Sequence, residues 1–239
     1  MKDFYFSQNW WQFLVMAIVC YLIGCVNFAR LISRKRHKDI TKIGSGNPGT
    51  MNMSREFGLK VGLLTFVCDA LKGGVPALVS YFIYRGYQFA GTQFVVSDFT
   101  RYFCALFVII GHIFPVTMHF KGGKGIASTL GMFWCSLSCE SAWWILLGFA
   151  VAVVVIGFIY WTEWGSLGSL LGVTGVSIAQ MTIFLLRYGK MPFNAYMVAT
   201  YLFLFALNVL TWCAHHENIA RLFAGEEHHT SIKKLAKKK

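Results

Sequence analysis

The chain is organised around one polar stretch, Gly44-Ser45-Gly46-Asn47-Pro48-Gly49-Thr50-Met51-Asn52-Met53-Ser54-Arg55. Three glycines and a proline among its first six residues are incompatible with the interior of a regular helix or strand. Glycine lets the backbone turn its N–H groups toward an anion, and the serine, asparagine and threonine side chains add neutral hydrogen-bonding groups. Arg55 adds a planar guanidinium that matches a phosphate or a carboxylate. The stretch is therefore either an ordinary loop or an anion-binding loop, and its spacing is not that of a nucleotide P-loop.

The composition excludes an ordinary soluble domain. Of the 239 residues, 56% are hydrophobic and 13% are charged, against about 25% charged residues in an average soluble domain. So large an apolar fraction indicates a polytopic membrane protein. The net charge of +12 lies at the ends of apolar runs, which favours membrane lipids and phosphorylated substrates as partners and argues against nucleic acid. The seven cysteines include no Cys-x-x-Cys pair, so we expect neither a disulfide framework nor a metal site.

Seven apolar segments follow one another along the chain. A bilayer core requires about 20 helical residues; five segments approach or exceed this length, whereas the third and fourth are shorter. We expect an all-α integral membrane protein, a compact bundle of about seven transmembrane helices. It forms one domain over residues 1–239, with a basic tail from about residue 228. Five full spans with a short hairpin is the alternative. The expected segments are Trp11–Leu31, Leu59–Tyr84, Tyr102–Met118, Ile126–Cys139, Ala142–Tyr160, Leu167–Leu186 and Tyr196–Ala214.

Basic residues are distributed unequally between the two faces of such a bundle. With seven spans, one face carries residues 30–60, 116–125 and the chain from His215 onward, which together hold sixteen Lys and Arg residues. The opposite face holds five. Because basic loops remain in the cytoplasm, we expect the N-terminus outside the cell and the glycine-rich loops, the active site and the C-terminus in the cytoplasm.

Two charges interrupt the second apolar segment. Asp69 and Lys72 are three residues apart and share one helical face, and a charge at membrane depth must be paired or line a polar cavity. We favour a structural ion pair and keep Lys72 as a candidate substrate contact. His112, inside the third segment, is interpreted as a packing residue.

A second glycine-rich stretch, Gly122-Gly123-Lys124-Gly125, precedes the fourth segment. A glycine nest, a helix N-terminus and a lysine together form an anion site. A basic turn against lipid headgroups is the alternative. Farther along, Ser166 is placed either to cap the sixth helix or to contact a substrate.

The C-terminal part of the chain carries a third polar group. His215, Asn218 and Arg221 follow one another at intervals of three, and Glu227 lies close behind. Residues at this interval share one face of a helix. A histidine, an amide and a guanidinium on one face beside a membrane form a plausible polar site.

The motifs occur in a specific order: Gly-Ser-Gly-Asn-Pro-Gly, Asp-x-x-Lys-Gly, Gly-His-x-x-Pro with Phe-Lys-Gly-Gly-Lys-Gly, Ser-Leu-Gly, and His-x-x-Asn-Ile-x-Arg-Leu-x-x-Gly-x-Glu. The set runs from about Gly24 to Glu227 and resembles the bacterial PlsY family of acyl-phosphate:glycerol-3-phosphate acyltransferases. The resemblance implies transfer of a fatty acyl group from acyl phosphate to the 1-hydroxyl of glycerol 3-phosphate, giving lysophosphatidic acid and phosphate. It implies a seven-helix bundle in the bacterial plasma membrane, which we expect to be a monomer without a cofactor.

The resemblance also assigns a candidate site. The positions that match the family's substrate-contacting residues are Ser45, Asn47, Arg55, Lys124, Ser166, His215, Asn218 and Glu227. Asn218, His215, Ser45 and Lys124 are the candidate catalytic residues. The family usually has threonine where this chain has Met51, so that hydroxyl contact is either absent or supplied by Thr50. The complete candidate set for substrate binding is Gly44, Ser45, Gly46, Asn47, Gly49, Thr50, Asn52, Arg55, Lys72, Gly122, Gly123, Lys124, Gly125, Ser166, His215, Asn218, Arg221 and Glu227.

The mechanism expected from these residues does not require a protein nucleophile, because acyl phosphate is already an activated mixed anhydride. The sequence contains neither a Gly-x-Ser-x-Gly elbow nor the His-x-x-x-x-Asp motif of acyl-CoA-dependent glycerolipid acyltransferases. Asn218 would orient the acyl carbonyl or donate to its oxyanion. His215 is either the general base or a positioning group while a substrate phosphate takes the proton, and we favour positioning. A membrane transporter or channel for a phosphorylated solute is the alternative function, although the two halves of the chain share no motif.

Overall fold

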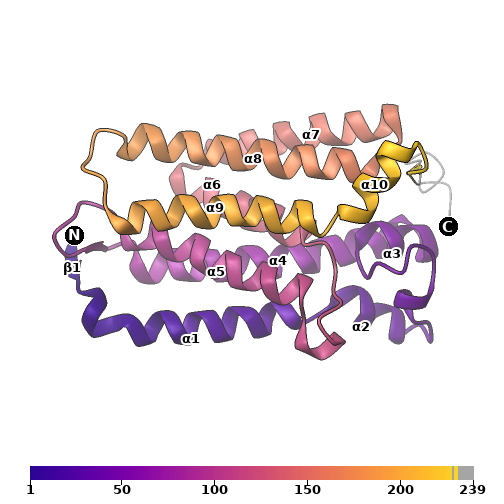
Figure 1. The fold of residues 1–239 in the computed structure, drawn as a ribbon, viewed down its shortest axis with the longest axis horizontal. Coiled ribbons are helices and arrows are strands. Elements are labelled where there is room, and N and C mark those ends of the chain that lie inside the picture. Colours follow the sequence, from indigo (N-terminus) through magenta and orange to yellow (C-terminus); the bar gives the residue numbers. More distant parts are fainter. Residues whose placement is uncertain (228, 231–239) are drawn as a thin grey trace.

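The computed structural model describes residues 1–227, 229 and 230, and the lysines of the expected basic tail lie outside these residues. Helices dominate the fold (Figure 1). The elements in chain order are β1 (Lys2–Phe4), α1 (Phe6–Cys25), α2 (Phe28–Arg34), the 3₁₀ turn η1 (Ile40–Lys42), α3 (Thr50–Phe57), α4 (Leu59–Tyr84), β2 (Tyr87–Phe89), α5 (Val96–Ile113), the 3₁₀ turn η2 (Val116–Met118), α6 (Ile126–Glu140), α7 (Trp144–Thr162), α8 (Gly165–Tyr188), α9 (Ala195–Cys213) and α10 (His216–Ala224).

The long helices run between two ends of the bundle. In Figure 1 the N-terminus lies at one end and α10 at the other, and we call these the N-terminal end and the C-terminal end. Each of the seven expected apolar segments overlaps one long helix among α1 and α4 to α9, so the all-α membrane bundle is confirmed. Within the described residues, six helical segments are long and apolar enough to cross a membrane. The exception is α6, which has 15 residues.

Glycines allow this short helix to pack closely along α4. A Cβ atom on Gly73 of α4 would lie 2.0 Å from the Ser128 carbonyl oxygen of α6, and one on Gly131 would lie 2.1 Å from the Ala70 carbonyl oxygen. Small residues permit such close approach of two helix backbones inside a membrane. The packing places the N-terminus of α6 beside the middle of α4, at the depth of Asp69.

The alternative of five full spans with a short hairpin is wrong, because α5 begins at Val96, six residues before the expected Tyr102. The early turns of α5 contain Asp98 and Arg101, both buried, and their charges obscured the helix in the sequence. Arg101 donates to Asp98 and, over 2.7 Å, to Glu140 of α6. Arg187 of α8 pairs with both carboxylates.

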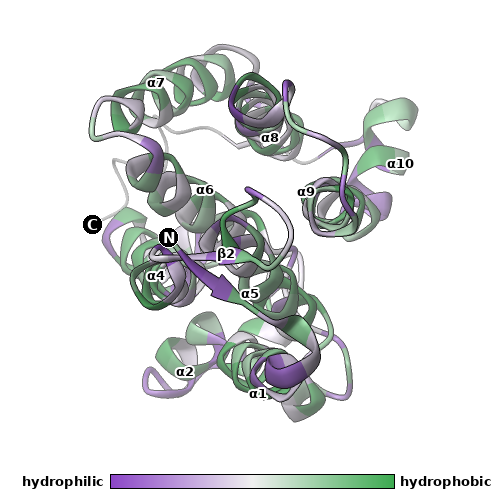
Figure 2. Ribbon diagram, turned by 90° about the vertical axis from the view of Figure 1, so that its left-hand side faces the viewer, coloured by the Kyte–Doolittle hydropathy of each residue, from purple (hydrophilic) through white to green (hydrophobic). Residues whose placement is uncertain are grey.

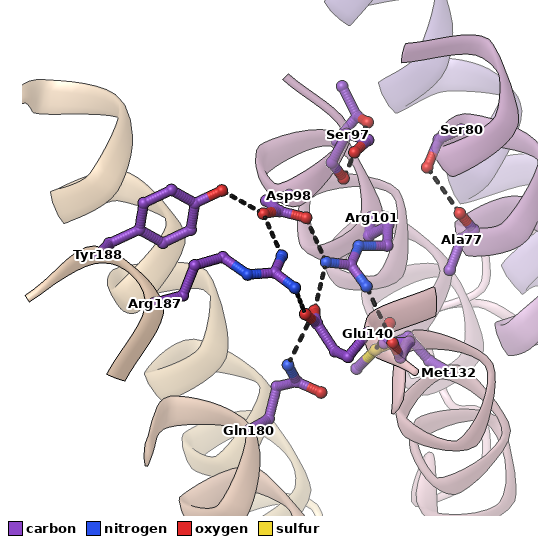
Figure 3. Close-up of polar contacts among 12 residues, drawn as sticks. Ala77, Ser80, Ser97, Asp98, Arg101, Met132, Glu140, Gln180, Arg187 and Tyr188 are labelled. Atoms are coloured by element: carbon purple, nitrogen blue, oxygen red, sulfur yellow. Dashed lines mark hydrogen bonds and ion pairs between the residues drawn. The ribbon is translucent and has the colours of Figure 1, made fainter. Parts of the chain in front are cut away.

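We call this group the outer ion cluster (Figure 3). Its two guanidinium groups balance its two carboxylates, and Tyr188 donates a further hydrogen bond to Asp98. Removing one partner would leave an uncompensated buried charge, which typically costs about 3–5 kcal/mol. The cluster therefore joins α5, α6 and α8 at the N-terminal end.

A small parallel sheet that the sequence did not predict covers the N-terminal end. Strand β1 pairs with β2, with Lys2 opposite Tyr87 and Phe4 opposite Phe89. Both phenylalanines are buried. The sheet thereby ties the N-terminus to the connection between α4 and α5.

The outside of the bundle is apolar. Figure 2 looks along the bundle and shows long helices that are mostly hydrophobic. Helix α7 illustrates this, because Gly148 is its only buried residue and Val153 and Val154 are about 70% exposed. Such a surface is stable only in contact with lipid. In contrast, α5 is the most buried of the candidate spans and forms the centre of the bundle.

Candidate active site

Four polar segments meet in a cavity of about 370 Å³ at the C-terminal end. They are the Gly44 loop with α3, the start of α6, the start of α8, and α10. Most of the predicted site residues are therefore brought together although they are distant in sequence. Those that line the cavity are Ser45, Asn47, Gly49, Thr50, Asn52, Arg55, Lys124, Gly125, Ser166, His215, Asn218, Arg221 and Glu227.

The Gly44 loop is folded around Asn52. The Asn52 amide donates to the Ile43 carbonyl over 2.8 Å and accepts from the Ser45 N–H over 3.3 Å. Gly44 and Gly46 have φ values of 61° and 68°, which favour glycine. A Cβ atom on Gly44 would also lie 2.3 Å from Asn52 Oδ1. These two glycines shape the loop but do not line the cavity.

The loop ends where α3 begins, at Thr50. Gly49 occupies the N-cap position of α3, so the positive end of the helix dipole lies at the cavity wall. The Thr50 hydroxyl is buried and has no hydrogen-bond partner among the described residues, while the Met51 side chain also lines the cavity. This placement favours Thr50 as the source of the hydroxyl contact that Met51 cannot make.

The expected anion nest at Gly122 and Gly123 is not formed. Their N–H groups donate to the carbonyl oxygens of Ile113 and His112, over 3.0 and 3.1 Å, at the end of α5. Glycine is needed here for close packing, because a Cβ on Gly122 would lie 2.1 Å from the His112 carbonyl oxygen. The turn serves to deliver its neighbours Lys124 and Gly125 to the cavity.

Lys72 forms the structural ion pair with Asp69 that the sequence analysis favoured, and it lies outside the cavity. Its ammonium group lies 3.2 Å from Asp69 Oδ1 and donates to the carbonyls of Gly24 and Val26, over 3.1 and 2.6 Å. These carbonyls belong to the junction between α1 and α2. Lys72 is buried and does not line the cavity, so it fastens this junction to α4.

A continuous chain of hydrogen bonds links the start of α6 to α10 and α8. Lys124 donates to Asn218 Oδ1, and Asn218 Nδ2 donates to Glu227 Oε1 over 2.7 Å. Ser166 and Arg221 also donate to Glu227, over 2.9 and 3.1 Å. Glu227 is thus the centre of this network and orients the amide of Asn218.

Ser166 is not the cap of α8. Trp164 occupies the N-cap position, and no described side chain makes a capping hydrogen bond there. The Ser166 hydroxyl instead donates to Glu227 and lines the cavity. The alternative interpretation, a side chain directed into the site, is therefore the one that the structure supports.

His215 lies at the junction of α9 and α10 and is 4% exposed. Its Nδ1 is 2.7 Å from the Thr211 carbonyl oxygen, which can only accept, so Nδ1 carries the hydrogen and Nε2 has the lone pair. Burial lowers the pKa of His215 to about 4, and the positive charge of Lys124 contributes to the shift. The imidazole is therefore neutral near pH 7 and is an acceptor at Nε2.

The cavity is cationic at its polar end. Arg55, Lys124 and Arg221 come from three different elements, and Glu227 partly balances them. Burial lowers the pKa of Arg55 and of Lys124. Burial alone would raise the pKa of Glu227, but the hydrogen bonds that it accepts outweigh this effect and lower it. A dianionic phosphate would complete the charge balance of these groups.

The structure places three further polar residues at the cavity. Asp69 and His112 line it, with Asp69 Oδ1 and His112 Nδ1 4.0 Å apart. Sequence analysis assigned Asp69 to a structural ion pair with Lys72 and His112 to packing, because each lies inside an apolar run. Thr230 accepts a hydrogen bond from Arg55 over 2.7 Å; no local pattern marked it.

Below the polar end, the cavity continues as an apolar channel between α6, α7 and α8. The sequence analysis missed this feature, because it is formed only when the three helices pack together. A Cβ on Gly172 of α8, for example, would lie 2.9 Å from a methyl group of Val155. The residues that line the channel include Leu130, Phe133, Trp134, Gly148, Val151, Ala152, Val155, Ile156, Gly172 and Val176.

A membrane-embedded helical bundle with a cationic pocket that opens into an apolar channel defines a class: an integral membrane protein whose cavity suits a phosphorylated group together with an alkyl chain. The model of the glycerol-3-phosphate acyltransferase family matches residues 14–225. The chain therefore belongs to the PlsY family of glycerol-3-phosphate acyltransferases, and it is a multi-pass membrane acyltransferase of phospholipid synthesis. This assignment excludes the alternative of a transporter.

Similar proteins support the assignment over nearly the whole chain. The glycerol-3-phosphate acyltransferase of Aquifex aeolicus is 31% identical over 218 residues, which cover 90% of this chain and 97% of that protein. Glycerol-3-phosphate acyltransferase 2 of Thermotoga maritima is 35% identical over 226 residues, which cover 94% and 98%. A crystal structure of PlsY in its glycerol 3-phosphate form has a TM-score of 0.73 and 28% identity, covering 95% of this chain and all of that one. A lysophosphatidic acid form has a TM-score of 0.70.

Proposed function

We propose that the protein transfers a fatty acyl group from acyl phosphate to the 1-hydroxyl of glycerol 3-phosphate, giving lysophosphatidic acid and inorganic phosphate. The observation that carries this proposal is the continuity of the cationic pocket with the apolar channel. The pocket suits the phosphates of both substrates, and the channel suits the acyl chain of the donor. Because phosphate is already a good leaving group, the protein needs only to neutralise the charge of such a donor and to orient it.

In this proposal the cationic side chains neutralise the two phosphate groups. Arg55 and Lys124 face the cavity from opposite elements, α3 and the start of α6, and Arg221 completes the set. The Asn218 amide is oriented by its bonds to Lys124 and Glu227. Its second N–H hydrogen remains to donate to the oxyanion that develops on the acyl carbonyl. Ser45 and Asn47 contribute neutral hydrogen bonds from the Gly44 loop.

His215 acts as a positioning group in the proposed reaction. Its neutral Nε2 accepts a hydrogen bond from the glycerol 3-phosphate and aligns the 1-hydroxyl with the carbonyl carbon. The hydroxyl oxygen attacks that carbon, the bond from carbon to the phosphate oxygen breaks, and the leaving phosphate takes the hydroxyl proton. An imidazole whose pKa is about 4 is a weak base near neutral pH, which supports transfer to phosphate.

We further propose the cellular arrangement that the basic residues indicate. The C-terminal end, with its site and its excess of Lys and Arg, faces the cytoplasm of a bacterium, where glycerol 3-phosphate is soluble, and the N-terminal end faces outward. The chain acts as a single-domain monomer in the plasma membrane, because one bundle supplies every residue of the proposed site.

Matched donors test the proposed reaction. Purified protein in detergent micelles is supplied with labelled glycerol 3-phosphate and either palmitoyl phosphate or palmitoyl-CoA. We expect one inorganic phosphate to be released for each lysophosphatidic acid formed from palmitoyl phosphate, and no product from palmitoyl-CoA. Comparable turnover with palmitoyl-CoA would refute acyl phosphate as the specific donor.

A pair of lysine variants links this activity to the cavity. Lys124→Met removes a charge that faces the cavity and should lower turnover by about 100-fold or more. Lys2→Met removes a lysine at the N-terminal end, in β1, and should leave turnover unchanged. Equal activity of the two variants would place the reaction elsewhere.

A further inference from the structure

The lining of the apolar channel reaches a definite level along α8. On α8 the lining runs from Ser166 at the polar end to Val176, a separation of ten residues or about 15 Å along the helix axis. An extended alkyl chain advances roughly 1.25 Å per methylene, from its C–C bond length and angle. About a dozen methylene groups therefore fit between the polar end and the level of Val176.

A tryptophan side chain lies at this end of the channel and packs against a glycine. Trp134 of α6 and Gly148 of α7 both line the cavity. A Cβ atom on Gly148 would lie 2.0 Å from both Cδ1 and Nε1 of the indole, so only glycine admits the ring in this position. The indole also lies against Phe149, with ring centroids 5.3 Å apart. Trp134 is thus held in place between α6 and α7 at the far end of the channel.

Behind this end lies the outer ion cluster. Gln180 of α8 is one helical turn beyond Val176, is fully buried, and donates to Glu140 over 3.4 Å. Figure 3 shows Gln180 beside Glu140, Arg101 and Arg187. An alkyl chain that extended past Val176 would have to displace buried ion pairs, which a hydrocarbon cannot replace. The cluster therefore acts as a rigid barrier beneath the channel.

The environment from which the acyl chain comes decides how the channel can discriminate between chain lengths. The chain enters from the bilayer, whose interior is as apolar as the channel, so burial alone gives longer chains no advantage. Discrimination must come from steric fit, and a group that exceeds a pocket by a methylene is rejected by about 10-fold or more. The residue that limits the length of the channel thus determines specificity.

We infer that Trp134, held against Gly148, is the specificity-determining residue that sets the acyl chain length of this enzyme, with the outer ion cluster as the barrier behind it. The inference rests on the proposed function for the identity of the donor, but the same channel must hold the acyl chain of the product. Chain-length selection therefore applies to lysophosphatidic acid as well as to the donor.

Two substitutions with opposite effects test this inference. For each variant, kcat/KM is measured with acyl phosphates of 10 to 18 carbons, and the affinity for lysophosphatidic acids of the same lengths is measured by competition. Trp134→Ala should raise the ratio of long-chain to short-chain kcat/KM by about 10-fold, because it opens the end of the channel. Gly148→Ala should lower the ratio, because the new methyl group displaces the indole into the channel.

Controls separate this effect from general damage. Trp143→Ala removes a neighbouring tryptophan that is 79% exposed, and it should leave the ratio unchanged. A loss of folding would lower every chain length equally, and Trp134→Phe provides a smaller truncation that should shift the ratio in the same direction as alanine. Unchanged ratios in Trp134→Ala and Gly148→Ala, or a shift in the same direction in both, would overturn the inference. If acyl phosphate proves not to be the donor, the lysophosphatidic acid affinities still decide the question.

Discussion

Replacement of Asn218 is the sharpest test of the proposed catalytic arrangement. The Asn218 side chain is 9% exposed and bridges Lys124 and Glu227. Its carbonyl oxygen is directed to the ammonium group and its nitrogen to the carboxylate, so one N–H hydrogen remains for the reacting carbonyl. Asn218→Ala removes this donor and leaves the two charged neighbours without the group that separates them.

The structure indicates the size of the effect. Loss of one donor to a developing oxyanion typically lowers turnover by about 100- to 1,000-fold, or roughly 2.7–4 kcal/mol of transition-state stabilisation. The loss of the two hydrogen bonds lowers folding stability by about 1–3 kcal/mol, which is small against the packing of seven long helices. The variant should therefore fold, bind both substrates and turn over slowly.

The assay measures kcat at saturating glycerol 3-phosphate and acyl donor, and thermal unfolding of the same preparation reports stability. Asn9→Ala is the matched control, because Asn9 is a half-buried asparagine in α1 at the N-terminal end whose amide donates to the Tyr5 carbonyl. A loss of less than about 10-fold in kcat for Asn218→Ala, or an equal loss for Asn9→Ala, would show that Asn218 does not stabilise the transition state.

The remaining predictions concern His215 and topology. His215→Gln should raise the KM for glycerol 3-phosphate, retain part of kcat and keep the acidic limb of the activity–pH profile; loss of that limb together with a turnover defect as deep as that of Asn218→Ala would identify His215 as the base. Because burial lowers the pKa of His215 from 6.5 to about 4, the unfolded chain binds more protons than the folded chain between these pH values. Stability should therefore decrease as the pH is lowered from 6.5 to 4, by about 3 kcal/mol at most, and the unfolding midpoints of His215→Gln should lack this dependence. For topology, Lys35 is an exposed residue on the face that is expected to be cytoplasmic. A membrane-impermeant thiol reagent applied outside intact cells should miss Lys35→Cys and Thr117→Cys and should label Thr92→Cys and Lys190→Cys, and the reverse pattern would contradict the proposed orientation.

The sequence by itself determined the helices and the composition of the site. Apolar segments of about 20 residues specify membrane helices, because the backbone polar groups of each segment must be satisfied within that segment. The polar motifs were recognised because placing serine, lysine, histidine and asparagine side chains next to a membrane costs free energy. Such residues therefore indicate a functional role. His215, Asn218 and Arg221 were placed on one face from their spacing alone, and all three line the cavity.

Only the tertiary structure decided which of these groups face one another. The start of α5 was hidden in the sequence because Asp98 and Arg101, which pair with each other, are fully compensated only by Glu140 of α6 and Arg187 of α8. The N–H groups of Gly122 and Gly123 were expected to bind an anion but are used by the end of α5, and Lys72 is used by the junction of α1 and α2. The apolar channel has no linear signature, since it is formed by the packing of three helices. Local sequence determines a helix through hydrogen bonds four residues apart, whereas contacts between helices depend on packing across the whole chain.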